Sequence, residues 1–64
     1  MDANTWKECL RVYKPYFYDW CKGKYNLGEL NASEFWRLFK HWFYDIRTDS
    51  KGRRITLKEA QKNE

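Results

Sequence analysis

The chain has 64 residues, with 13 lysine and arginine residues against 9 aspartate and glutamate residues and an aromatic fraction of 20%. A chain of this length forms one small domain, residues 1–64, and buries only about 60% of the surface that its unfolded form exposes, so its core depends on a few large side chains. No run approaches the roughly 18 apolar residues of a membrane span, and the first residues lack the regions of a signal peptide, so we expect a soluble, cytoplasmic protein.

The first predicted helix spans residues 5–22. Thr5 and Glu8 have the spacing of a capping box, which places Thr5 at the N-cap. Pro15 normally ends or kinks a helix, yet the apolar residues keep one helical phase across it. These apolar residues are Trp6, Cys9, Leu10, Tyr13, Tyr16, Phe17 and Trp20. We therefore expect one helix kinked at Pro15; the alternative is two short helices, with Pro15 opening the second.

A loop over residues 22–29 follows, in which Gly23 has the character of a helix C-cap. We expect Tyr25 and Leu27 to fold back from this loop onto the core. The loop is long enough for the two flanking helices to pack as a helical hairpin, and it is longer than the tight turn of a DNA-binding helix-turn-helix.

The central helix, predicted over residues 32–47, has the strongest signals in the chain. Asn31 is a good N-cap, and Glu34 has the position that closes a capping box. Apolar residues then recur at the spacing that places them on one helical face: Phe35, Leu38, Phe39, Trp42 and Ile46. This face must be buried against another element.

The C-terminal part is predicted to form a turn over residues 48–52 and a short helix over residues 57–62, opened by Thr56 and Glu59 in a third capping box. The expected fold is therefore all-α, a helical hairpin of two long amphipathic helices plus a short C-terminal helix. The alternative pairs residues 44–48 with residues 53–57 as a β-hairpin, which would make the fold α+β.

The sequence gives little support to catalysis, and we expect no enzyme activity, no cofactor and no metal site. His41 is the only histidine, and a contact with Asp45 one helical turn later is typical of a solvated surface pair. Cys9 and Cys21 lack the short paired spacing of zinc motifs. On one helix these cysteines would lie about 18 Å apart, too far for a disulfide, so we expect reduced thiols.

The central helix has more aromatic surface than one neighbouring helix can cover, because Trp36 and Phe43 extend the apolar face sideways and Tyr44 lies on the far side. An aromatic patch with arginine is typical of protein interfaces. We therefore predict a partner-binding surface made of Trp36, Arg37, Lys40, Phe43, Tyr44 and Arg47. The alternative is that the loop and the terminal helix close over Trp36 and Phe43.

Basic residues also form a stripe along the first helix and a cluster in the C-terminal turn, where they are candidate contacts to phosphates or to an acidic surface. These candidates are Lys7, Arg11, Lys14, Tyr18, Lys22, Lys51, Arg53 and Arg54. The alternative interpretation is an ordinary solvated helix face, because lysine and arginine are good helix formers.

Two functions remain. We favour a small binding protein that docks on a partner protein with an acidic surface and regulates or inhibits it, in keeping with the small accessory proteins that viruses and mobile elements encode. The alternative is a basic nucleic-acid-binding protein with little sequence specificity. Acidic residues that would repel a phosphate backbone count against this alternative: Asp19, Glu34, Asp45 and Asp49. The same aromatic patch could instead bind a second copy of the chain. We expect no membrane partner.

Overall fold

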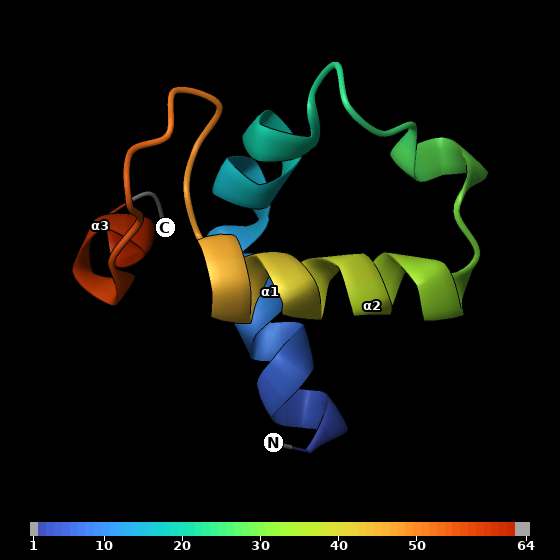
Figure 1. The fold of residues 1–64 in the computed structure, drawn as a ribbon. Helices are drawn as coiled ribbons and strands as arrows, with labels where there is room; N and C mark the ends of the chain where they lie inside the picture. The colour runs from blue at the N-terminus through green and yellow to red at the C-terminus, as the bar shows by residue number, and fades with distance from the viewer. Residues whose placement is uncertain (1, 63–64) are drawn as a thin grey trace.

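The computed structural model describes residues 2–62. Its α-helices in that range are α1 (Ala3–Cys21), α2 (Ala32–His41) and α3 (Leu57–Gln61). A 3₁₀ turn, Leu27–Glu29, lies between α1 and α2, and a π-helical turn, Trp42–Ile46, continues α2. Figure 1 shows α1 passing behind α2 at a steep angle, with α3 on the opposite side of the molecule from the 3₁₀ turn. The predicted all-α fold is confirmed.

The start of α1 differs from the prediction. The helix begins at Ala3, and its N-cap is Asp2, whose side chain accepts a hydrogen bond of 2.8 Å from the Thr5 N–H. The prediction of Thr5 as the N-cap is therefore wrong. Aspartate is at least as good a cap as threonine, and its negative charge also interacts favourably with the helix dipole, so the earlier start adds helical residues before Thr5.

The helix continues through Pro15, which confirms one helix rather than two. Pro15 lies on an exposed face, where water can replace the backbone donor that proline lacks. Beyond the C-cap, Gly23 has a φ of 78°, a conformation that favours glycine. This turn lets the N–H groups of Lys24 and Tyr25 donate to the Cys21 carbonyl at 2.9 and 3.0 Å.

The capping box predicted for α2 is confirmed in both directions. The Glu34 N–H donates to Asn31 Oδ1 at 2.8 Å, and the Asn31 N–H donates to Glu34 Oε1 at 3.2 Å. The helix predicted through residue 47 is α-helical only to His41; the next five residues form the wider π turn. The π turn is capped by Arg47, which has a left-handed conformation with a φ of 50°.

The core is built largely from aromatic rings where α1 meets α2 and the π turn. Phe17 is fully buried, and its ring centroid lies 5.2 Å from that of Phe39 and 5.5 Å from that of Trp42. The full set of buried apolar residues is Trp6, Val12, Tyr13, Phe17, Trp20, Cys21, Phe39, Trp42, Ile55 and Ala60. Leu27 packs against this core as expected, whereas Tyr25 remains 47% exposed.

The segment after the π turn is a compact loop and not a β-hairpin. Within residues 2–62 its only β-type pairing is one isolated antiparallel bridge between Thr48 and Arg54, so the α+β alternative is wrong. The Trp42 indole Nε1–H donates to the Thr48 carbonyl at 2.9 Å, and the Ile55 N–H donates to the Arg47 carbonyl at 2.9 Å. A buried indole and a buried isoleucine therefore hold this loop against the core.

Two carboxylates organise the tip of the same loop. Asp49 Oδ1 accepts from the N–H groups of Lys51 and Arg53 at 2.9 and 3.0 Å, and its Oδ2 accepts from Arg53 Nε at 3.2 Å. Asp19 of α1 accepts from the Ser50 N–H at 2.9 Å. These backbone N–H groups stabilise the charged forms, so they hold the pKa values of Asp49 and Asp19 below the ordinary aspartate value.

The last helix, α3, begins as predicted and ends one residue earlier, at Gln61. The Thr56 hydroxyl accepts from the Glu59 N–H at 3.2 Å, which is the N-cap contact of the expected capping box. Buried Ala60 and the Tyr16 hydroxyl, which donates to the Glu59 carbonyl at 3.3 Å, attach α3 to α1. Within residues 2–62, no helix is long and apolar enough to cross a membrane.

Phe17→Ala should lower the free energy of unfolding by about 3–5 kcal/mol, because it leaves a cavity at the centre of the ring cluster. Urea denaturation followed by circular dichroism measures the change. Tyr44→Ala is the matched control, since this ring is 63% exposed, and it should cost about 1 kcal/mol or less. Equal losses in the two variants would contradict the central position of Phe17.

The free energy of unfolding should fall as the pH is lowered below about 4. A carboxylate with a depressed pKa in the folded state contributes stability above its unfolded pKa, and this stability is lost as the pH falls through the folded value. Asp49→Asn and Asp19→Asn together should make this decline shallower in urea titrations between about pH 7 and pH 2.5. A decline as steep as that of the wild type would show that these loop contacts do not set the acid sensitivity.

Candidate partner-binding surface

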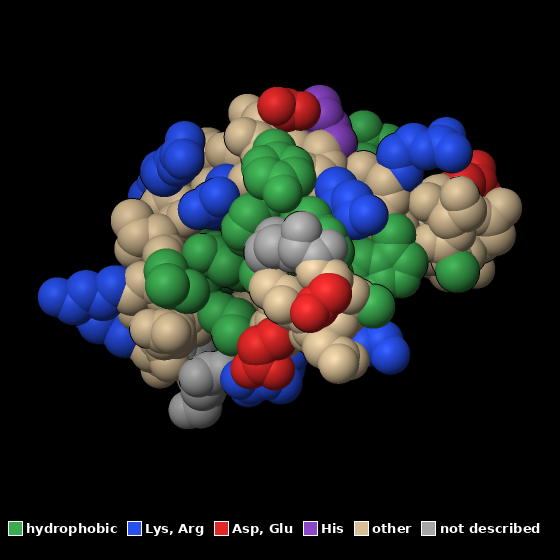
Figure 2. All heavy atoms as spheres, turned by 90° about the horizontal axis from the view of Figure 1, so that it is seen from below, with side chains coloured by type: hydrophobic (Ala, Val, Ile, Leu, Met, Phe, Trp, Pro, Cys, Tyr) green, Lys and Arg blue, Asp and Glu red, His purple; other side chains and the backbone are tan. Residues whose placement is uncertain are grey.

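A hollow of about 210 Å³ lies where the start of α1 meets α2. It is lined by Ala3, Trp6, Lys7, Trp36 and Lys40, and we call it the tryptophan hollow. Seen from the N-terminal end of α1, this face shows hydrophobic side chains with lysine and arginine and also aspartate and glutamate side chains around them (Figure 2). Two tryptophans and two lysines line the hollow itself, so it combines an apolar floor with a positively charged rim.

Trp6 forms the floor because three aromatic rings of α2 and the π turn hold it in place. Its ring centroid lies 6.1 Å from Phe39, 5.6 Å from Phe43 and 5.6 Å from Tyr44, all in edge-to-face geometry. Edge-to-face packing places the positive ring edge against the negative ring face and gives each contact a preferred orientation. The floor is consequently part of the packed core and is formed before any partner arrives.

Two of the six residues predicted to bind a partner line this hollow, and a third lies beside its floor. Trp36 is half-buried and contacts Phe39 at a centroid distance of 6.0 Å, so it forms one wall. Lys40 is exposed and its Nζ lies 5.2 Å above the Trp6 ring. Tyr44 stands beside Trp6 with 63% of its surface exposed, the largest exposed fraction among the large hydrophobic residues described.

Phe43 and Arg47 are engaged within the molecule. The Phe43 ring lies 5.3 Å from Tyr13 of α1 and is half-buried, so α1 covers part of it, and not the loop or the terminal helix that the alternative named. The Arg47 guanidinium lies 4.1 Å from the Phe43 ring centroid, and its Nε donates to the Phe43 carbonyl at 3.0 Å. These two residues do not line the hollow.

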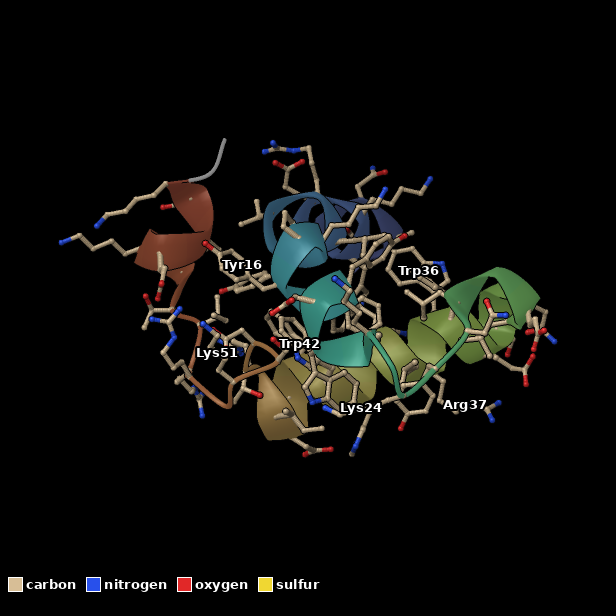
Figure 3. The ribbon with its side chains drawn as sticks, turned by 90° about the horizontal axis from the view of Figure 1, so that it is seen from above. Tyr16, Lys24, Trp36, Arg37, Trp42 and Lys51 are labelled. Carbon is tan, nitrogen blue, oxygen red and sulfur yellow. The ribbon has the colours of Figure 1, made fainter. Side chains whose placement is uncertain are left out.

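Arg37 lies on a different side of α2. Figure 3 shows Trp36 on the side of α2 that faces α1, whereas the Arg37 side chain extends away from it into solvent. Adjacent residues in a helix point about 100° apart, so one flat partner cannot easily cover both. The structure thus separates Arg37 from the tryptophan hollow.

The π turn explains why the sequence pattern did not predict that Phe43 and Arg47 are engaged within the molecule. A π turn has its hydrogen bonds between residues five apart, here from the Arg47 N–H to the Trp42 carbonyl, so side chains rotate away from the 3.6-residue period. Trp42 is fully buried and Tyr44 is exposed, as the pattern predicted, whereas Phe43 and Arg47 are engaged within the molecule. The pattern of helix faces assigned Trp6 only to the core. Its contact with Lys40 joins two helices, and a pattern along one helix does not predict such a contact.

The candidate phosphate contacts lie in two parts of the molecule. Lys7 belongs to the tryptophan hollow, and Arg11 is paired with Glu8, its Nε lying 3.0 Å from Oε1. Arg53 is bound to Asp49. All of these residues are exposed, including the five without such contacts: Lys14, Tyr18, Lys22, Lys51 and Arg54. The predicted stripe keeps its helical spacing on α1, and the C-terminal candidates lie in the loop before α3, so the candidates form two separate groups.

Most of the carboxylates that sequence reasoning counted against an anionic partner are occupied locally. Asp19 and Asp49 accept loop N–H groups, and Glu34 accepts the Asn31 N–H. Asp45 Oδ2 lies 2.8 Å from His41 Nδ1 on the exposed face. A carboxylate that accepts N–H groups keeps its negative charge, so these residues still count against an anionic partner.

The two thiols are not activated nucleophiles. Both cysteines are free, and burial raises the pKa of the Cys9 thiol and raises that of Cys21 to about 11. A raised pKa keeps a thiol protonated at neutral pH, the opposite of an activated nucleophile. The described residues include no group of three or more His, Cys, Asp or Glu side chains arranged to hold a metal ion.

Comparison with known proteins found no matching protein family, no similar curated protein and no similar solved structure.

Trp36→Ala should lower the free energy of unfolding by about 1 kcal/mol, because the ring is half-buried at the edge of the core. Phe39→Ala, one turn away and fully buried, should cost about 3 kcal/mol or more. Thermal unfolding followed by circular dichroism compares the two. If the two variants lose the same free energy of unfolding, Trp36 belongs to the core and is not available as a wall of the tryptophan hollow.

Proposed function

We propose that the chain is a small non-catalytic binding protein that docks on an acidic surface of a partner protein through the tryptophan hollow and Tyr44. The observation that carries the proposal is the lining of the hollow. Two tryptophans and two lysines surround it together with Ala3, and no carboxylate is among the lining residues. An apolar recess with a cationic rim is complementary to an apolar side chain flanked by carboxylates.

The size of the hollow suits one anchoring side chain. A cavity of about 150 Å³ holds a benzene ring, and this hollow offers about 210 Å³. A leucine or phenylalanine of the partner would contact Trp6 and Trp36, while its acidic neighbours meet Lys7 and Lys40. A central buried anchor surrounded by polar contacts is the arrangement that contributes most of the binding energy in protein interfaces.

Occupancy is the mechanism that this surface supports. The protonated thiols offer no reactive group, so the effect on the partner comes from covering part of its surface. Occupying an acidic surface blocks whatever cation or basic ligand the partner would bind there, which makes the chain a regulator or inhibitor. This mode of action is in keeping with small accessory proteins that viruses and mobile elements encode.

The test compares proteins captured from a lysate of the native host by tagged wild-type chain and by two surface variants, Lys40→Glu and Tyr44→Ala. We expect one protein, retained in stoichiometric amount after nuclease treatment, to be lost by at least tenfold with both variants. Lys58→Glu is the matched control for the charge change, because Lys58 lies on α3. It should capture as much of the partner as the wild type.

The proposal is wrong if the surface variants and the control capture the same proteins in the same amounts. It is also wrong if nuclease removes all retained material, since that outcome requires nucleic acid as the bridge. Circular dichroism spectra recorded at the temperature of the capture show that each variant is folded, which is expected of Tyr44→Ala because it costs about 1 kcal/mol or less.

A further inference from the structure

A second exposed aromatic surface lies at the other end of α1. Tyr18 is 41% exposed, Tyr25 is 47% exposed, and both line a hollow of about 440 Å³ where α1 meets the following loop. We call it the tyrosine groove. The remaining lining residues are Cys21, Lys22, Asn26, Leu27 and Gly28, so no carboxylate lines this groove.

The tyrosine groove continues along the molecule. Tyr18, Leu27 and Gly28 also line a second hollow, of about 510 Å³, which extends over Phe35 to Trp36. A track of connected hollows therefore leads from Tyr25 past Tyr18 towards the N-terminal end of α2. Aromatic rings recur along this track, which suits a ligand that presents several flat apolar groups in succession.

Lysines lie beside these rings. Lys14 Nζ is 5.3 Å from the Tyr18 ring centroid, and Lys24 Nζ is 4.5 Å from that of Trp20, whose ring lies 5.7 Å from Tyr25 (Figure 3 labels Lys24). Both lysines are exposed, so their ammonium groups remain available to a ligand. Cations beside exposed aromatic rings are the combination that binds phosphates and bases together.

The negative groups closest in sequence to the groove do not line it. Asp19, next to Tyr18 in the chain, accepts the Ser50 N–H and keeps its charge, and the Cys21 carbonyl at the end of α1 accepts the N–H groups of Lys24 and Tyr25. Glu29 ends the 3₁₀ turn next to Gly28, but it is not a lining residue of either hollow. The lining itself is neutral or positive.

We propose that the tyrosine groove binds single-stranded nucleic acid, with bases stacked on Tyr25 and Tyr18 and phosphates in contact with Lys14, Lys22 and Lys24. Stacking on open rings tolerates any base, so the binding has little sequence preference. A duplex keeps its bases stacked inside and offers none to the rings. The tyrosine groove itself shares no lining residue with the tryptophan hollow, although the hollow that continues the groove reaches Trp36, which lines both. Binding at Tyr25 and Tyr18 is therefore a separate proposal from the protein partner proposed above.

The test is fluorescence anisotropy of a fluorescein-labelled oligothymidylate of about 12 nucleotides, titrated with the full chain. Three phosphate contacts on a single strand give a slope of about −2 for log K against log salt concentration between about 50 and 200 mM. Lys14→Gln with Lys22→Gln should reduce that slope by about 1.4. The corresponding duplex should bind at least fivefold more weakly than the single strand.

Tyr25→Ala should weaken binding of the oligothymidylate about fivefold or more, and Tyr25→Phe, which keeps the ring face, should bind within twofold of the wild type. Tyr44→Ala makes the same change on the other surface and should leave the affinity unaltered. Three results would overturn the proposal: no binding of the single strand, duplex binding as tight as single-strand binding, or equal losses in Tyr25→Ala and Tyr44→Ala. Displacement of the oligonucleotide by poly-L-glutamate at equal charge would also overturn it, since that ligand has no bases.

Discussion

The packing of Phe17 against rings from α2 and the π turn is the interaction on which the rest of the structure depends. A chain of 64 residues cannot bury many side chains. A fully buried ring in contact with Phe39 and Trp42 therefore supplies a large share of the apolar surface that folding buries. Because α1 and α2 cross at these rings, the crossing also decides which aromatic residues remain outside. The tryptophan hollow lies towards one end of α1 and the tyrosine groove towards the other.

Much of the fold was predictable because residues close together in the sequence determine where two of the helices begin. Asn31 with Glu34, and Thr56 with Glu59, are short-range contacts that a sequence pattern identifies directly. Asp2 replaced the predicted cap of α1 because two overlapping caps were available and the earlier one gives a longer helix. The π turn has no such local signature, so the positions of residues 42–47 could not be read from a 3.6-residue period.

The candidate surface was only partly predictable for the same reason. Trp36, Lys40 and Tyr44 were found on the expected face, whereas Arg37 required knowledge of how α1 crosses α2, and Phe43 and Arg47 required knowledge of the π turn. Trp6 contributes to the surface from another helix, which no single-helix pattern describes. The function itself, a protein partner or any other, remains a proposal supported by the lining of these hollows.

The distribution of the tryptophans gives the molecule a built-in optical reporter. Trp6, Trp20 and Trp42 are buried, and Trp36 alone is half-buried at the edge of the tryptophan hollow, so the four indoles differ in their access to solvent. A dissolved collisional quencher reaches Trp36 more readily than the other three in the folded chain. The quenchable part of the intrinsic emission therefore comes mainly from Trp36, and a ligand that covers the tryptophan hollow alters the signal without any added dye.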